Sequence, residues 1–305
     1  MRFVFPAVCA LLNSLIVGTL LIGIIFVGVR PVYAVEEPKE LLLGVEPEHN
    51  IFDQMERYLV LADYLTEQLG VKVKLTIMSR YGEVIKRFKT LKLDGAFLTP
   101  YTATLGIREL NLEPLVNPVN LDGEFTSQGY IFVRKDSGIH SIGDMEGGSI
   151  VFVDPATMEG YLFPLLFLQQ HGVTDINKFY SRYYFSGSNA SAIFAVLDGR
   201  ADIGAAKSTV YNRLVENDPS IAQDLDVIAK SIKVPEITLC IRSEIAPELK
   251  DKLAEILLQM DETPEGMKVL KQFKARGFIK AQKENYAVIE DMAMKVLGTL
   301  TVHGR

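Results

Sequence analysis

The sequence has 305 residues, of which 48% are hydrophobic and 23% are charged, with two Cys, no Trp and a formal net charge of -6. This is the composition of a folded protein with a sizeable core, and it excludes a disordered chain, collagen and a disulfide-rich scaffold. The acidic balance offers no positive field to a phosphate backbone, so we expect no nucleic-acid partner.

The N-terminus is typical of an export or membrane segment. Residues 3–29 carry no charge, and a polar break at Asn13-Ser14 leaves an apolar stretch over 15–29. With small residues at positions 32 and 34, this predicts a Sec-type signal peptide cleaved after Ala34. The whole run is also long enough to span a bilayer, so an uncleaved anchor through residues 3–29 is the alternative. Both place the rest of the chain in the periplasm or on the extracytoplasmic face.

Removal of residues 1–34 leaves 271 residues with 30 basic and 38 acidic side chains, a net charge of -8. Cys240 is then the one remaining cysteine, so no internal disulfide can form even in an oxidising compartment. It stands within the apolar run 237–241. We therefore expect a small buried hydrophobic side chain rather than a reactive thiol.

After a charged linker at 36–40, the hydrophobic pattern predicts alternating strands and helices. Helices are predicted over 53–69 (ended by Gly70), 83–91, 100–110, 159–171 and 190–197, and strands over 41–45, 71–77, 95–98, 130–134, 150–153, 180–185, 201–204, 226–229 and 237–241. The remaining C-terminal part is predicted to be helical over 249–260, 263–274 and 285–297. This alternation is typical of an α/β protein with mostly parallel sheets flanked by helices.

Motifs for catalysis are missing from the sequence. It contains no H-E-x-x-H, G-x-S-x-G or G-x-x-x-x-G-K-[ST] pattern and no paired-cysteine zinc spacing. The four histidines, at positions 49, 140, 171 and 303, lie far apart with no ligand or base spacing. We therefore expect no enzymatic activity, no catalytic residue, no cofactor and no metal site.

Ligands of open α/β sheets bind beyond the carboxyl ends of the strands, so the residues directly after each strand are the informative ones. Four stretches combine small polar residues or a tyrosine with a helix start: 79–81, 98–101, 153–161 and 186–189. Such an arrangement offers backbone N–H groups to a ligand.

These stretches, in this order and behind a signal peptide, resemble the phosphate/phosphite/phosphonate type of periplasmic substrate-binding protein, the solute receptor of an ABC importer. The resemblance covers about residues 40–297. It is carried by the Tyr81 turn, LDGAFLTPY at 93–101, GYIFVRKDSGI at 129–139, D-P-x-x-x-x-G-Y-L-x-P at 154–164, AVLDGRADIG at 195–204 and RSEIAPELK at 242–250.

The resemblance implies a type II periplasmic-binding-protein fold, in which two α/β lobes joined by two crossing hinge strands clamp the ligand between them. It implies lobe one at 40–132 plus 243–305, lobe two at 133–242, and crossings near 130–135 and 237–242. The implied partners are a small polar solute, such as the oxyanions phosphonate or phosphite, and an ABC permease; we expect a monomer. A membrane-tethered ligand-sensing domain with the same fold is the alternative.

The resemblance also implies ligand-binding residues. The aromatic contacts of the family match Tyr81 and Tyr130, and Tyr101 adjoins the same cleft. The anion cradle, usually Ser-Thr-Ser-Gly at a helix N-terminus, is here Thr157-Met158-Glu159-Gly160, which keeps one hydroxyl and the glycine for close backbone approach. A His-Asp pair of the family is replaced by Asn189-Ala190, preceded by Ser188, and an acidic position falls near Thr209.

Glu159 leaves two interpretations open. A carboxylate in the first turn of a helix interacts favourably with the helix dipole, so Glu159 could simply stabilise the helix and point outward. If it points into the cleft instead, it would repel a phosphonate and suit an amine-bearing or neutral ligand.

Overall fold

The computed structural model describes residues 40–48 and 51–300, which belong to one compact unit over 37–305. The segment expected to be a signal peptide or anchor, residues 1–34, lies outside the described residues. Within the described ranges, no helix is both long and apolar enough to cross a membrane.

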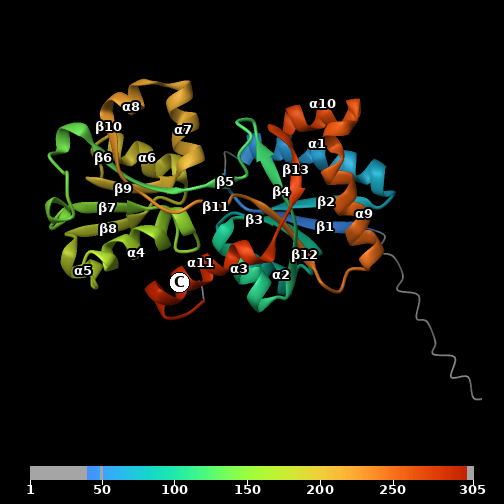
Figure 1. The fold of residues 1–305 in the computed structure, drawn as a ribbon, viewed down its shortest axis with the longest axis horizontal. Helices are drawn as coiled ribbons and strands as arrows, with labels where there is room; N and C mark the ends of the chain where they lie inside the picture. The colour runs from blue at the N-terminus through green and yellow to red at the C-terminus, as the bar shows by residue number, and fades with distance from the viewer. Residues whose placement is uncertain (1–39, 49–50, 301–305) are drawn as a thin grey trace, which may run out of the picture. The chain divides into compact units, whose positions relative to one another are not determined.

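The first sheet has six strands in the order β13-β4-β12-β3-β1-β2 (Figure 1). The strands are β1 Glu40–Val45, β2 Lys72–Ile77, β3 Gly95–Leu98, β4 Leu112–Asn120, β12 Thr238–Arg242 and β13 Ala275–Lys280. β1 pairs in parallel with β2 and β3, while β12, β4 and β13 add antiparallel ladders. β1 and β3 are almost wholly buried, in keeping with their apolar sequences.

The second sheet has five strands in the order β10-β6-β9-β7-β8. The strands are β6 Gly129–Arg134, β7 Ser149–Phe152, β8 Arg182–Phe185, β9 Ile203–Lys207 and β10 Leu225–Lys230. β7 pairs in parallel with β8 and β9, whereas β6 pairs antiparallel with β9 and β10. The predicted α/β class is confirmed, but both sheets are mixed rather than mostly parallel, because β12 and β13 in the first sheet and β6 in the second run antiparallel to their neighbours.

Two short segments carry the chain between the sheets. β5 Thr126–Ser127 lies between β4 and β6, β11 Val234–Pro235 lies between β10 and β12, and the two pair antiparallel. The segments expected as crossings, 130–135 and 237–242, overlap strands β6 and β12 of the two sheets. Their apolar residues reflect burial within a sheet, and the paired strands β5 and β11 precede them in the chain.

Helices flank both sheets (Figure 1). They are α1 Ile51–Leu69, α2 Val84–Thr90, α3 Pro100–Glu109, α4 Phe163–Gln170, α5 Ile176–Phe179, α6 Asn189–Leu197, α7 Ser208–Asn217, α8 Ser220–Asp224, α9 Pro247–Leu258, α10 Pro264–Phe273 and α11 Ala287–Leu297. A π-helical turn, Met158–Leu162, leads directly into α4. Gly70 follows α1 with φ +73°, the left-handed conformation that glycine adopts easily after a helix end.

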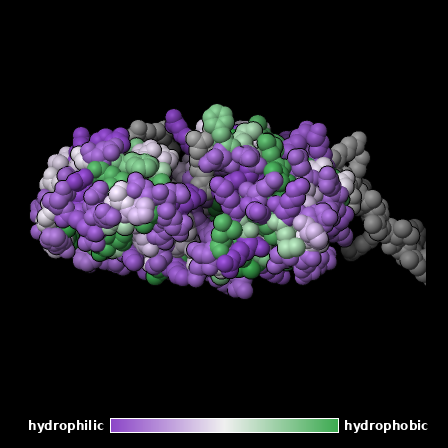
Figure 2. All heavy atoms as spheres, turned by 90° about the horizontal axis from the view of Figure 1, so that it is seen from above, coloured by the Kyte–Doolittle hydropathy of each residue, from purple (hydrophilic) through white to green (hydrophobic). Residues whose placement is uncertain are grey.

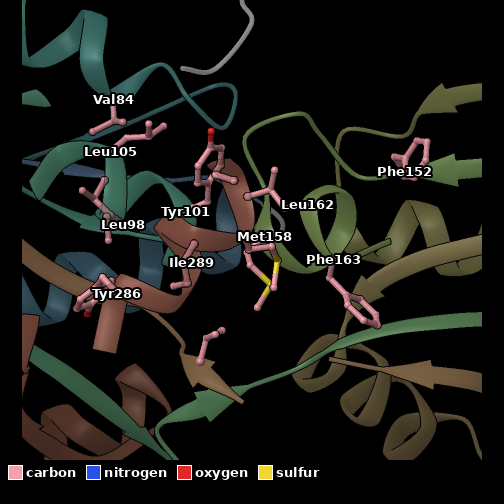
Figure 3. Packing of buried hydrophobic residues seen from close by; sticks show 14 of the residues in the cluster. Val84, Leu98, Tyr101, Leu105, Phe152, Met158, Leu162, Phe163, Tyr286 and Ile289 are labelled. Carbon is pink, nitrogen blue, oxygen red and sulfur yellow. The ribbon is translucent and has the colours of Figure 1, made fainter. Parts of the chain in front are cut away.

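One hydrophobic cluster contains residues from both halves of the chain. It joins Leu98 and Tyr101 beside the first sheet to Met158 and Leu162 in the π-helical turn, and Ile289 of α11 packs against them (Figure 3). α11 contacts both α3 and α4. Outside such clusters the face in Figure 2 is mostly hydrophilic, with small separate hydrophobic areas. The two sheets thus share part of one core, which positions their strand ends relative to each other.

Candidate functional site

Lys207, the last residue of β9, lies at the centre of a buried polar network. Its side chain is only 2% exposed, and its Nζ donates to the carboxylate of Glu48, which follows β1. The same Nζ lies 3.3 Å from Oε1 of Glu236, between β11 and β12. One ammonium therefore links a strand end of each sheet to the segment that connects the sheets.

Burial and neighbouring charges shift the pKa values of this network in opposite directions. Burial opposes the charge of Lys207, but Glu236 and Glu48 outweigh it and raise the pKa of the ammonium. Burial likewise acts against Glu236, yet Lys207 and hydrogen bonds lower the pKa of that carboxyl. Burial raises the pKa of Glu48, with Lys207 opposing. Asn189 fixes the strand end, because its Oδ1 accepts from the backbone N of Lys207 at 2.8 Å.

The side chain of Glu46, which follows β1, lies at the N-terminus of α3. Its Oε2 accepts from the backbone N of Thr99 at 2.8 Å, from Thr99 Oγ1 at 3.0 Å and from Thr102 Oγ1, and its Oε1 accepts from the backbone N of Gly82 at 3.3 Å. Burial raises the pKa of Glu46 to about 7, although these hydrogen bonds favour its ionised form. The groups that donate hydrogen bonds to Glu46 are thus all neutral, and they belong to the turns at the strand ends and the start of α3.

Tyr81 follows β2 and reaches the hydrophobic cluster of the second sheet, where it packs in one group with Tyr130, Val153 and Ala156. It is 5% exposed, and among the described residues its hydroxyl has no hydrogen-bond partner. Burial raises the pKa of Tyr81 well above its ordinary value, and nearby carboxylates, led by Glu48 and Glu46, add to the effect. The hydroxyl therefore faces an acidic, enclosed region.

The Glu159 side chain points into the protein interior and not outward to solvent. The side chain is 3% exposed, and its Oε1 accepts from Ser127 Oγ at 2.8 Å. Its charge acts on both Lys207 and Tyr81. Glu159 is thus part of the buried network and does not face solvent from the first turn.

The rest of the expected cradle has other contacts. Thr157 Oγ1 donates to the backbone O of Asp154 at 2.7 Å, a bond within the turn, and Met158 is fully buried in the shared hydrophobic cluster. A Cβ on Gly160 would lie 2.4 Å from Cγ2 of Val153. The Val153 side chain therefore fills the space beside Gly160, and the glycine allows close packing within the chain.

The remaining expected tyrosines are packing residues of the two hydrophobic clusters. Tyr130 in β6 makes an edge-to-face contact with Tyr211 at 5.6 Å, and Nζ of Lys230 lies 5.2 Å from its ring centroid. Tyr101 in α3 is fully buried in the shared core (Figure 3). Burial raises the pKa of Tyr101 to about 12, with smaller effects from Glu109 and Tyr161, which are not the groups that surround Tyr81.

The last three expected residues, Ser188, Asn189 and Thr209, differ in their contacts. Ser188 caps α6 by accepting from the backbone N of Ser191 at 3.1 Å, and it is half-buried. Asn189 and Thr209 belong to the Lys207 network, where Thr209 Oγ1 donates to Glu236 Oε1 at 2.7 Å. Asn189 therefore holds the backbone of Lys207, and Thr209 bonds the carboxylate of Glu236.

Four residues of the network are not predicted from the sequence: Glu46, Glu48, Lys207 and Glu236. A signal was present, because Glu46-Pro47-Glu48 directly follows the first buried strand and thus satisfies the strand-end criterion. Lys207 was missed because the strand was predicted to end at 204, whereas β9 continues to Lys207. Across 40–48 and 51–300, no group of three or more His, Cys, Asp or Glu side chains is arranged to hold a metal ion.

A groove of about 890 Å³ opens beside this network, and Tyr81 belongs to both. It runs between the 79–83 turn of the first sheet and the ends of β7 and β8 in the second. Its lining includes two cations and two acids: Arg80, Lys86, Glu83 and Asp154. The groove is therefore mixed in charge, and Tyr81 forms part of its lining.

Residues 43–286 match the family described as "ABC transporter, phosphonate, periplasmic substrate-binding protein". The sequence is 26% identical over 232 residues to the phosphate-import protein PhnD of Mycolicibacterium smegmatis, covering 73% of this chain and 72% of the relative. It is 25% identical over 278 residues to a probable phosphite-binding protein, PhnD1, of Prochlorococcus marinus, covering 87% and 92%.

Solved structures show the same fold. PhnD1 from Prochlorococcus marinus in complex with methylphosphonate superposes with a TM-score of 0.75 at 22% identity, covering 86% of this chain and all of that one (100%). A binding-protein component of a phosphonate transporter from Pseudomonas aeruginosa also has a TM-score of 0.75, at 21% identity, covering 86% and 87%.

Proposed function

The chain belongs to the family of phosphonate periplasmic substrate-binding proteins of ABC transporters, and from this premise we propose that it binds one small polar solute outside the cytoplasm and delivers it to an ABC permease. Its fold is the type II periplasmic-binding-protein fold. The protein acts by binding and release without chemical change of the solute, and as a monomer.

The lobes that close are the parts of the chain built on the two sheets, with β5 and β11 as the hinge. Segments this short can absorb a change of backbone angles while each sheet stays rigid. Ligand bound between the lobes would then shift the population toward the closed form by the contacts that it makes with both.

One observation carries the proposal: buried polar side chains from both sheets meet at the strand ends. Tyr81 and Glu48 come from the first sheet, Glu159 and Lys207 from the second, and all four are at least nine-tenths buried. Binding proteins need such a convergence, since a ligand must contact both lobes to favour closure. The names of the relatives supply the first solutes to test, namely phosphate, phosphite and methylphosphonate.

A thermal-shift screen of the protein produced from its full-length gene tests the proposal. A true ligand raises the melting temperature progressively with concentration, because it binds only the folded state. We expect Tyr81→Phe to reduce that shift, and Tyr64→Phe, a matched change in the separate hydrophobic cluster beside α1, to leave it unchanged. A broad solute library that leaves the melting temperature unmoved would refute the receptor function.

A further inference from the structure

The two walls of the groove differ in their chemistry. Arg80 and Lys86 line it from the turn after β2 and the first turn of α2, whereas Tyr183, Tyr184 and Phe185 line it from β8. Positive charge therefore comes from the side of the first sheet, and a run of aromatic residues comes from the second. A solute that uses both walls contacts both sheets, as closure around a ligand requires.

The two cations of the groove are available to an anion. Arg80 and Lys86 are exposed, and neither side chain makes an ion pair or a hydrogen bond with any residue in 40–48 or 51–300. The charge of Arg80 acts on the carboxyl of Asp154, where it lowers the pKa against the larger effect of burial. An oxyanion can thus accept charge-assisted hydrogen bonds from both side chains without breaking an ion pair of the chain.

The two acids of the groove already have hydrogen-bond donors. Glu83 pairs with Arg87 at 3.0 Å and accepts from Ser79 Oγ at 2.9 Å. Asp154 Oδ1 accepts from a backbone N–H of its own turn at 2.8 Å. Because Arg87 balances the charge of Glu83, the two unpaired cations face one carboxylate, and the groove keeps an excess of positive charge.

The aromatic wall is part of a larger cluster of rings. Tyr183 is 38% exposed, and its ring centroid lies 6.0 Å from that of Phe152 and 6.3 Å from that of Phe185. Phe185 also contacts Tyr161 edge to face at 5.4 Å. Aromatic rings pack favourably in edge-to-face and offset arrangements. A ligand ring can therefore extend this cluster where Tyr183 is open to solvent.

The groove is also larger than a small oxyanion needs. Its volume of about 890 Å³ lies in the range of roughly 300–1,000 Å³ that holds drug-sized ligands. The expected cradle at 157–160 is taken up by the chain itself, since Thr157 bonds within its turn and Val153 fills the space beside Gly160. An anionic group and a bulky substituent therefore both find their contacts in the groove.

We propose that the groove binds an organophosphonate that carries an aromatic ring, with Arg80 and Lys86 bonding its oxygens and the rings of β8 packing against its own ring. The inference rests on the proposed function as a solute receptor and names the class of solute. Asp154 lines the wall of the second sheet and would repel an anion there. The phosphonate group therefore lies toward α2, and the ring lies toward Tyr183.

Titration calorimetry with methylphosphonate, phenylphosphonate and benzyl alcohol separates the contribution of the charged group from that of the ring. We expect phenylphosphonate to bind at least tenfold more tightly than either of the others, because it alone uses both walls. Methylphosphonate or benzyl alcohol binding as tightly as phenylphosphonate would overturn the assignment. If none of the three binds, the assignment is also wrong, whereas the receptor function fails only if the broad solute library leaves the melting temperature unmoved.

Variants of exposed side chains, which should fold normally, locate the contacts. Tyr183→Ala should weaken phenylphosphonate about tenfold and leave methylphosphonate unchanged, and Phe194→Ala, which removes a 41% exposed ring of α6 outside the groove, is the matched control. Arg80→Gln and Lys86→Gln should each weaken both phosphonates, whereas Lys89→Gln, exposed on α2 outside the groove, should not. Equal effects of Tyr183→Ala and Phe194→Ala, or no loss in the Arg80 and Lys86 variants, would refute the proposed contacts.

Discussion

Lys207→Met should destabilise the protein strongly, because the ammonium is the shared partner of two buried carboxylates. The side chain is 2% exposed, pairs with Glu48 and lies 3.3 Å from Glu236. Methionine keeps the length of the side chain but leaves both carboxylates buried without this cation. Removal of one partner from a buried ion pair costs about 3–5 kcal/mol, and we expect a loss of that size in the free energy of unfolding.

Urea unfolding at pH 7.5, followed by circular dichroism, measures this loss. Lys233→Met is the matched control, since Lys233 pairs with Glu124 at 2.9 Å on an open surface with both side chains more than half exposed. That variant should unfold within experimental error of the wild type. Adding Glu48→Gln to Lys207→Met should recover part of the loss, because one stranded charge is removed. A loss below about 1 kcal/mol for Lys207→Met would refute the buried ion pair.

Three further predictions follow from single positions. Glu46 is buried with a pKa raised from 4.5 to about 7, so the folded state holds its proton more tightly than the unfolded state does. The free energy of unfolding should therefore fall by about 3 kcal/mol as pH rises from below 4.5 to above 7. Urea unfolding of Glu46→Gln across the same pH range should lack this fall. Gly160→Ala should cost about 1–3 kcal/mol by forcing Val153 aside, measured as a lower melting temperature; an unchanged value would refute the packing role. The thiol of Cys240 is buried with a raised pKa, so it should resist iodoacetamide in the native state and react after unfolding, and rapid native labelling would contradict this.

The strands that alternate or form short apolar runs were predictable from the sequence, and β3 was predicted at its observed bounds. β4 and β13 were not predicted. β4 contains Pro114 and Pro118, and β13 begins Ala275-Arg276-Gly277, so local propensity disfavours both as strands. They form because β12 and β4 offer paired edges, which only the tertiary structure supplies.

The candidate site was predictable only in part. Tyr81 and Glu159 can be proposed from the sequence, because the resemblance carries them and strand-end turns are where ligands bind. Glu46 and Glu48 look like an ordinary charged turn in the sequence, and their burial depends on contacts with Thr99 and Lys207, far along the chain. Sequence spacing cannot reveal that the charges of two separate turns meet in one enclosed region.

A crystal structure of the protein with the solute that raises its melting temperature tests the central claim most directly. We expect the solute to lie between the two sheets and to contact side chains from both, among them the Tyr81 hydroxyl. A solute that contacts residues of one sheet alone, with the Tyr81 hydroxyl still unbonded, would contradict it.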